Sequence, residues 1–265
     1  MSIYKKRLFL LDMDGTIYLG NRLFDHSLMF LSKIKQMGAS YIFFTNNSSK
    51  SLENYVSKLN AMGIDAGCNQ IISSSSVTIS YLIKKYGKKP IYAMGTAAFC
   101  SELTKNGLNI VNNTDAQISA FVMGFDTELN FSKLEDACIL LGRGIDYIAT
   151  NCDLLCPTEY GYVPDCGSIA QILKNATGRE PVFMGKPAPH MVDLALERMK
   201  CSKEDAVLIG DRMYTDIACG NAAGIDTALV LSGESKREDL EMSLYKPTYV
   251  FEDVGEIFAN RGILI

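Results

Sequence analysis

The fold of the chain is decided at residues 9–16, FLLDMDGT, an apolar run that ends in two carboxylates two positions apart. A continuous apolar run of this kind is typical of a buried strand in a parallel sheet. Ligands of open α/β sheets bind beyond the carboxyl ends of the strands, so Asp12 stands where chemistry is expected. Asp14 follows, and Gly15 permits a sharp turn of the backbone. Two carboxylates this close repel unless a cation or a shared proton intervenes, and Mg²⁺ favours such oxygen ligands.

Three further segments have the same design. Residues 41–47, YIFFTNN, predict a strand that ends in a hydroxyl and two amides. Residues 182–187, VFMGKP, predict a third buried strand, which ends in Lys186 just before a helix. Residues 207–211, VLIGD, predict a fourth, and Asp216 follows five residues after its last aspartate. The four strand ends thus offer two pairs of carboxylates, a hydroxyl with amides, and a cation.

Strand-like and helix-like segments alternate along the whole chain, which predicts an α/β fold. None of the four motifs falls between residues 48 and 184, although this segment carries strands and helices of its own. We therefore expect a Rossmann-like core with a parallel sheet, formed by residues 1–75 and 182–265. A second, inserted α/β domain is expected at residues 76–181.

The composition excludes several classes of protein. Hydrophobic residues make up 48% of the 265, which is typical of a globular chain. No apolar run reaches the roughly 20 residues needed to span a membrane, and no signal peptide follows the basic residues 1–7. The net charge of 26 − 30 = −4 argues against a nucleic acid polymer as partner.

Eight cysteines in a chain without a signal segment predict reduced thiols in a cytoplasmic protein. The only cluster is formed by Cys152, Cys156 and Cys166. The chain has just two histidines, so a fourth zinc ligand is lacking, and we expect buried thiols at these positions.

The four motifs resemble the signatures of the haloacid dehalogenase-like hydrolases: DMDGT at 12–16, TNN at 45–47, GKP at 185–187, and GD with TD at 210–216. The second and third motifs, together with CGSI at 166–169 and TGREP at 177–181, are similar to the NagD-like branch. The resemblance covers residues 8 to about 235. It implies a magnesium-dependent, metal-binding phosphatase with an α/β cap domain between the second and third motifs.

The chemistry of phosphoryl transfer and the resemblance assign the same roles to the first motif. Asp12 is the candidate nucleophile, which forms an aspartyl-phosphate intermediate. Its alternative role is that of a metal ligand only. Asp14 protonates the leaving alkoxide and then activates water, as general acid and base. The resemblance also makes the backbone carbonyl of Asp14 a metal ligand.

The other motifs supply phosphate and metal contacts. Thr45 and Asn46 can donate a hydroxyl and a backbone amide to the phosphate. Lys186 is a point charge suited to phosphate and to the nucleophile. Asp211 is expected to hold Mg²⁺ together with Asp12 and the backbone carbonyl of Asp14. Asp216 is expected to hold a metal-bound water or to orient the lysine, and its alternative role is to cap a helix.

Substrate choice is expected in the cap, in the segments nearest the third motif. The candidates for facing the leaving group are Asn151, Asp153, Tyr160, Tyr162 and Asp165. Members of the branch act on nucleoside monophosphates such as UMP, sugar phosphates, phosphoglycolate, glycerol phosphate and pyridoxal phosphate. We favour a nucleotide phosphatase of broad specificity because the two tyrosines can stack on a base. A sugar phosphate, phosphoglycolate or glycerol phosphate phosphatase is the alternative. Asn-Cys-Asp at 151–153 departs from the Asn-Pro-Asp of many relatives, so the substrate class stays open.

Other functions remain to be weighed. The resemblance implies that dehalogenases lack the second aspartate of the first motif, so Asp14 disfavours them. A Rossmann dehydrogenase needs a glycine-rich turn after its first strand, which this chain lacks. A phosphomutase or phosphotransferase would use the same core and stays open. A silent, phosphate-binding regulatory protein is disfavoured because the residue set is intact. The expected partner is a small phosphorylated metabolite and not a membrane. Caps of this kind can form homodimers, so the oligomeric state also stays open.

Overall fold

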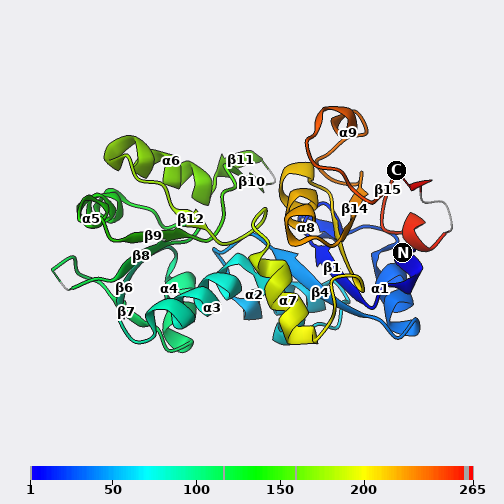
Figure 1. Cartoon of the computed structure of the whole chain (residues 1–265), viewed down its shortest axis with the longest axis horizontal. Helices are drawn as coiled ribbons and strands as arrows, with labels where there is room; N and C mark the ends of the chain where they lie inside the picture. Colours follow the sequence, from blue (N-terminus) through cyan, green and yellow to red (C-terminus); the bar gives the residue numbers. More distant parts are fainter. Residues whose placement is uncertain (1, 116, 159, 260–262, 265) are drawn as a thin grey trace. The chain divides into compact units, whose positions relative to one another are not determined.

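The computed structural model describes residues 2–115, 117–158, 160–259 and 263–264. The chain forms two compact units (Figure 1). The core unit comprises Met1–Thr45, Tyr55–Ile72 and Lys186–Ile265, and the inserted unit comprises Asn46–Asn54 and Ser73–Gly185. The sequence predicted the domain boundaries near residues 76 and 181. In the structure the inserted unit begins and ends a few residues away from those positions, and it also takes in residues 46–54.

The core unit is built on a seven-stranded sheet in the order β16-β15-β14-β13-β1-β4-β5. Its strands are β1 (Leu8–Asp12), β4 (Ser40–Thr45), β5 (Ile71–Ser73), β13 (Ala206–Gly210), β14 (Asp226–Val230), β15 (Tyr249–Phe251) and β16 (Ile263–Leu264). Strand β1 is buried along its length and pairs in parallel with β4 on one side and β13 on the other. The order of the strands therefore reverses at β1, which creates the switch point where such sheets bind ligands.

Short helices and turns complete the core unit. They are η1 (Ile3–Lys5), the hairpin β2 (Tyr18–Leu19) with β3 (Arg22–Leu23), α1 (Ser27–Gln36), α2 (Leu52–Ala61), η2 (Cys68–Gln70), α7 (His190–Met199), η3 (Met213–Ile217), α8 (Ala218–Ala223), α9 (Asp239–Met242) and η4 (Glu256–Phe258). The η3 segment is a single π-helical turn. The first residues of α2 belong to the inserted unit. No helix in the described part of the chain is long and apolar enough to cross a bilayer.

The inserted unit has its own five-stranded sheet in the order β12-β9-β8-β6-β7, with parallel pairing throughout. Its elements are α3 (Ser74–Tyr86), β6 (Pro90–Met94), α4 (Ala97–Lys105), β7 (Asn109–Val111), β8 (Ala120–Met123), α5 (Phe131–Gly142), β9 (Asp146–Ala149), α6 (Cys166–Thr177) and β12 (Val182–Phe183). Helices α5 and α6 cover one face of this sheet and α3 and α4 the other (Figure 1). An antiparallel hairpin, β10 (Leu155–Thr158) and β11 (Gly161–Pro164), precedes α6.

One predicted strand is wrong in its place and its burial. Residues 182–187 were expected to form a buried strand of the core sheet that ends in Lys186. Only Val182–Phe183 is a strand, and it pairs with β9 at the edge of the inserted sheet. The Val182 side chain is 55% exposed, as an edge position allows. A short apolar run does not reveal which of two sheets it joins, and this is why the sequence misplaced it.

Candidate active site

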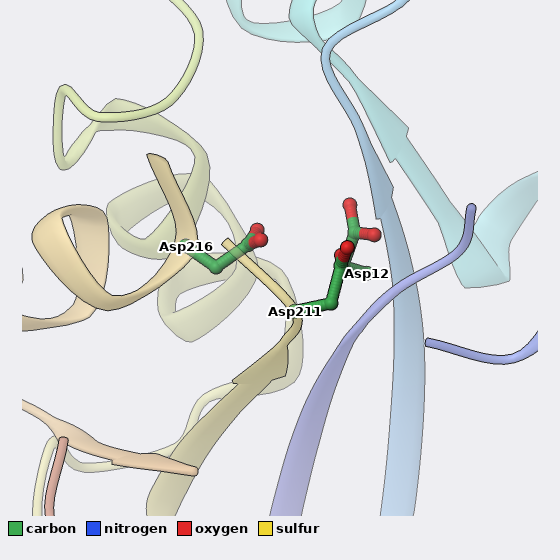
Figure 2. Close-up of side chains that lie close together, drawn as sticks. All are labelled: Asp12, Asp211 and Asp216. Atoms are coloured by element: carbon green, nitrogen blue, oxygen red, sulfur yellow. The ribbon is translucent and has the colours of Figure 1, made fainter. Parts of the chain in front are cut away.

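The site lies at the switch point of the core sheet. Asp12 is the last residue of β1, Asp211 directly follows β13, and Asp216 belongs to the η3 turn. Carboxylate oxygens of these three residues lie within 4.8 Å of one another. Figure 2 shows the three side chains converging from their separate elements. Three of the acidic residues singled out from the sequence are thus brought together.

Lys186 lies among these carboxylates. Its Nζ atom donates to Asp12 Oδ1 at 2.5 Å and to Asp216 Oδ1 at 2.6 Å. The lysine is 3% exposed and Asp216 is fully buried. Asp216 also accepts a hydrogen bond from the backbone N–H of Arg212 at 3.2 Å, so it fixes both its own turn and the lysine. The ammonium is thereby held against the carboxylate that ends β1.

The Asp211 carboxylate is fixed by backbone that packs closely around it. Its Oδ2 accepts the backbone N–H of Glu234 at 2.7 Å, and its Oδ1 accepts the Thr16 hydroxyl at 3.4 Å. A Cβ atom at Gly15 or Gly233 would collide with this carboxylate. Gly15 also has φ +88°, which glycine adopts readily. The glycine of the DMDGT motif is therefore required for both its conformation and its lack of a side chain.

The site is buried and its carboxylates outnumber its cations, and this shifts their pKa values. Burial raises the pKa of Asp211 to about 6, and the neighbouring Asp216 adds to the effect. Burial also raises the pKa of Asp12 well above its ordinary value, against the opposing influence of Lys186. Burial alone would lower the pKa of Lys186, but Asp12 and Asp216 outweigh it and raise the pKa above the usual value for lysine. When all three carboxylates are ionised, they and the ammonium carry 3 − 1 = 2 negative charges in this small volume, and the raised pKa values reflect the cost of that state.

This arrangement suits a divalent cation. Its donors are carboxylate oxygens, which hard ions such as Mg²⁺ prefer. An ion of charge +2 would balance the excess and return the carboxylates to their ionised form. The residues present therefore fit a magnesium-type ion on the chemistry of their donors alone.

Known proteins match this chain over nearly its full length. A family model described as haloacid dehalogenase-like hydrolase matches residues 9–109, and a second of the same type matches residues 183–257. The acid sugar phosphatase of Staphylococcus saprophyticus is 34% identical over 97% of this chain and 98% of its own. The solved 4-nitrophenylphosphatase of Thermotoga maritima is 41% identical, with a TM-score of 0.91 over 96% of this chain and 97% of that one.

The chain belongs to the haloacid dehalogenase-like hydrolases. Its second and third motifs, and a similar solved structure of the nagD type, place it in the NagD-like branch of this family. It is an enzyme, a phosphoric monoester hydrolase, and the inserted unit corresponds to the cap of the family. A glycerol phosphate phosphatase of Mycobacterium tuberculosis, solved in complex with magnesium, is 29% identical, with a TM-score of 0.91 over 97% of this chain and 78% of that one.

Asp14 and Thr45 flank the central cluster of this hydrolase. Asp14 is exposed and pairs through its backbone with Tyr18. Burial raises the pKa of the Tyr18 hydroxyl, and the Asp14 carboxylate raises it further, so these two side chains lie close together. Thr45 ends β4 and is 8% exposed. In the register of the sheet, Asp12 lies opposite Phe44, so Thr45 is one residue beyond it at the same edge.

The cap residues that were expected to face the leaving group divide into two groups. Asn151, Asp153 and Asp165 are buried. The Asn151 amide donates to both aspartates, and Asp153 also accepts from the Asn46 side chain. Tyr160 and Tyr162 are 83% and 67% exposed on the β10-β11 hairpin. The first group is therefore part of the cap interior, and only the tyrosines present their side chains to solvent.

The loop that follows β14 also contributes to the site, although no residue of it was predicted from the sequence. Besides the N–H of Glu234, this loop contributes the Ser232 hydroxyl, which donates to Gly15 O at 2.8 Å. The Ser235 hydroxyl accepts the backbone N–H of Met213 at 3.1 Å. The signal was present, because the segment Ser-Gly-Glu-Ser directly follows an apolar run and so marks another strand end at the same edge.

Proposed function

We propose that the enzyme is a magnesium-dependent phosphatase of small phosphate monoesters that works through a phosphorylated Asp12. One observation carries the proposal: the Lys186 ammonium lies 2.5 Å from the Asp12 carboxylate at the switch point, with Asp211 and Asp216 beside it. A buried carboxylate held next to a cation is a nucleophile that can meet a phosphate dianion without uncompensated repulsion.

The first step forms the covalent intermediate. Asp12 Oδ attacks phosphorus in line with the ester oxygen, and the bond between phosphorus and that oxygen breaks. Asp14 gives its proton to the departing alkoxide, a task that suits its exposed position beside Tyr18. The Lys186 ammonium, the Thr45 hydroxyl and the backbone N–H after Thr45 receive the charge on the phosphoryl oxygens.

The second step releases phosphate. Asp14, now ionised, takes a proton from water as that water attacks phosphorus. A bond forms between phosphorus and the water oxygen as the bond between phosphorus and Asp12 breaks, which releases phosphate and regenerates the free carboxylate. Asp216 keeps the lysine in place through both steps by its 2.6 Å hydrogen bond.

Asp12, Asp211 and the backbone carbonyl of Asp14 are the proposed holders of Mg²⁺. The bound ion would neutralise phosphate charge and keep the carboxylates ionised. The excess of two negative charges supports this assignment. The magnesium complex of the related glycerol phosphate phosphatase supports it as well.

The activities for which the relatives are named favour one class of substrate over another. One is an acid sugar phosphatase and another a glycerol phosphate phosphatase, which favours phosphorylated sugars and polyols. Nucleoside monophosphates such as UMP are the second candidate, because the exposed rings of Tyr160 and Tyr162 are able to stack on a base.

The test is phosphate release from a panel of sugar phosphates, glycerol phosphate, nucleoside monophosphates and 4-nitrophenyl phosphate, with Mg²⁺ and with EDTA. We expect release that EDTA abolishes and Mg²⁺ restores, with the sugar and polyol phosphates ranked above UMP. Removal of both tyrosines by Y160A/Y162A separates the two classes further, since only nucleotide turnover depends on stacking. Equal release with and without EDTA would contradict the magnesium assignment.

A further inference from the structure

The two places where the chain crosses between its units are adjacent to proposed phosphate contacts. The core unit includes Thr45 and resumes at Lys186, while Asn46 and Gly185 already belong to the cap. Each of these catalytic residues is therefore bonded directly to a residue that the cap holds. Whatever fixes Asn46 and Gly185 within the cap also limits where their neighbours can lie.

Asn46 is fixed by a buried aspartate of the cap. Its Nδ2 donates to Asp153 Oδ2 at 2.7 Å, and its backbone carbonyl accepts the Ser74 hydroxyl at 2.5 Å. Asp153 Oδ2 accepts a second amide, from Asn151 Nδ2, at 2.8 Å. Asp153 is 8% exposed and Asn151 is fully buried. Hydrogen bonds to an ionised acceptor in such surroundings are strong and directional, so the orientation of Asn46 is closely set.

The same network extends to the second crossing. Asn151 Oδ1 accepts the Thr150 hydroxyl at 2.9 Å, and the Thr150 carbonyl accepts the backbone N–H of Gly185 at 2.7 Å. A Cβ atom at Gly185 would come within 2.6 Å of Asn46 Oδ1 and 2.7 Å of Thr150 O. The Asn46 amide therefore packs directly against the backbone of Gly185. One cluster in the cap thus holds both crossing segments.

Asp165 supports this cluster from the start of α6. Its Oδ1 accepts from Asn151 Nδ2 at 3.0 Å and from the backbone N–H of Cys166 at 2.5 Å, so it also caps the helix. The loop after Asn46 is held as well, because the Ser48 hydroxyl lies 2.8 Å from that of Thr150. The aspartates expected to face the leaving group are thus engaged with amides of the cap itself.

We propose that Asp153 is a positioning residue, which acts through Asn46 on both crossing segments. It limits where Thr45 and the backbone of Lys186 can lie, and it does not select the substrate. This role rests on the proposed function for its effect on turnover. Its effect on the two segments does not depend on any activity. A displacement of about 1 Å at such contacts lowers turnover by about 100-fold.

The test compares Asp153→Asn with Asp126→Asn, a matched control. Asp126 is also a buried aspartate of the cap, 4% exposed, but its carboxylate pairs with Lys133 at 2.7 Å and accepts the backbone N–H of Glu128, and it bonds to neither crossing segment. Hydrogen exchange is measured over peptides covering residues 44–49 and 183–188. Turnover of 4-nitrophenyl phosphate and of a sugar phosphate is measured at a temperature where thermal unfolding shows both variants folded.

In Asp153→Asn we expect faster exchange in both peptides and a kcat about 10- to 100-fold lower for both substrates alike, with KM changed less. In Asp126→Asn we expect neither effect, whatever its melting temperature. Unchanged exchange in the two peptides overturns the proposal. So does a loss confined to one substrate, which would make Asp153 a specificity residue. If the wild type releases no phosphate from any substrate, the proposed function has failed, and the exchange comparison still decides the positioning role.

Discussion

At the carboxyl edge of the core sheet three carboxylates crowd around one lysine, whereas in the cap Asp126 has a lysine of its own, and Asp153 and Asp165 accept from the Asn151 amide. Lys186 lies between Asp12 and Asp216, with Asp211 adjacent. In the cap, Lys133 binds Asp126 at 2.7 Å and the Gly95 carbonyl at 2.9 Å. Both sheets are parallel and both edges are polar. The carboxyl ends of a parallel sheet thus offer a place for a site, and carboxylates crowded within 4.8 Å of one another around a single cation mark the edge that is built to receive a ligand.

The strongest test of this difference makes the same substitution at both edges, Asp12→Asn in the core and Asp126→Asn in the cap. We expect the first to lower kcat by about 10⁴-fold or more, because the nucleophile is lost while its volume is kept. The fold should not suffer, since burial already disfavours the charge of Asp12. Steady-state phosphate release measures kcat, and thermal unfolding measures the stability of the fold. For the control we expect kcat within about twofold of wild type. Turnover of Asp12→Asn within tenfold of wild type would rule out the covalent mechanism.

A second matched pair replaces the two lysines, Lys186→Met and Lys133→Met. Loss of the first cation should lower kcat by about 10²- to 10³-fold, because one preorganised charge at the phosphoryl group is gone. Loss of the second leaves Asp126 buried without its cation and should cost about 3 kcal/mol of unfolding free energy with little change in kcat. Denaturant unfolding and initial rates separate the two results. A collapse of kcat in Lys133→Met would show that the cap edge takes part in the chemistry.

The variant Asp211→Ala tests whether Asp211 is a ligand of Mg²⁺. This carboxylate is held by Glu234 N–H and Thr16 rather than by a cation, so it is available to a metal ion. We expect the Mg²⁺ concentration for half-maximal activity to rise by about 10- to 100-fold. The measurement is a Mg²⁺ titration of phosphate release against wild type. An unchanged midpoint would move the ligand assignment to other residues.

The smallest expected effect concerns Glu102, a buried carboxylate of the cap. It is 9% exposed, and the described residues offer its Oε2 no hydrogen-bond partner. Burial raises its pKa from 4.5 to about 7, and Glu53 adds to the shift while Lys105 opposes it. A carboxylate with a raised folded-state pKa contributes stability that is fully present below pH 4.5 and is lost as pH rises through about 7.

Glu102→Gln stays uncharged at every pH, so above pH 7 it should be more stable than wild type by about 2–3 kcal/mol. Below pH 4.5 the two proteins should be equally stable. Denaturant unfolding at a series of pH values measures the difference. A parallel pH dependence in the two proteins would show that Glu102 is not the titrating group. Activity should not differ, because this charge lies outside the site.

The contrast between the sheets also explains what the sequence could predict. The core strands that end in Asp12 and Thr45, and the one that precedes Asp211, were predicted because each is a long apolar run closed by a polar residue. Their meeting at one edge follows from parallel pairing. Lys186 was predicted as a site residue because it was expected to end a strand of the core sheet. The strand before it belongs to the cap sheet instead. Its place among the aspartates depends on a chain crossing, which local pattern does not encode.

The cap was harder to predict because its polar residues act through distant partners. Asp153 and Asn151 were expected to face the leaving group. Their hydrogen bonds join residues up to 107 positions apart. The β10-β11 hairpin was not expected because its strands are only four residues long and carry no alternating pattern. Long-range hydrogen bonds and short edge strands are determined by packing, and they become visible only in the folded chain.

The most direct test of the covalent mechanism is the stereochemical course at phosphorus. A phosphorothioate monoester made chiral with ¹⁸O is hydrolysed in ¹⁷O-labelled water, and the configuration of the released thiophosphate is determined. Attack by Asp12 and then by water inverts phosphorus twice, so the account predicts overall retention. Overall inversion would mean that water attacks the ester directly, and it would contradict the assignment of Asp12 as nucleophile.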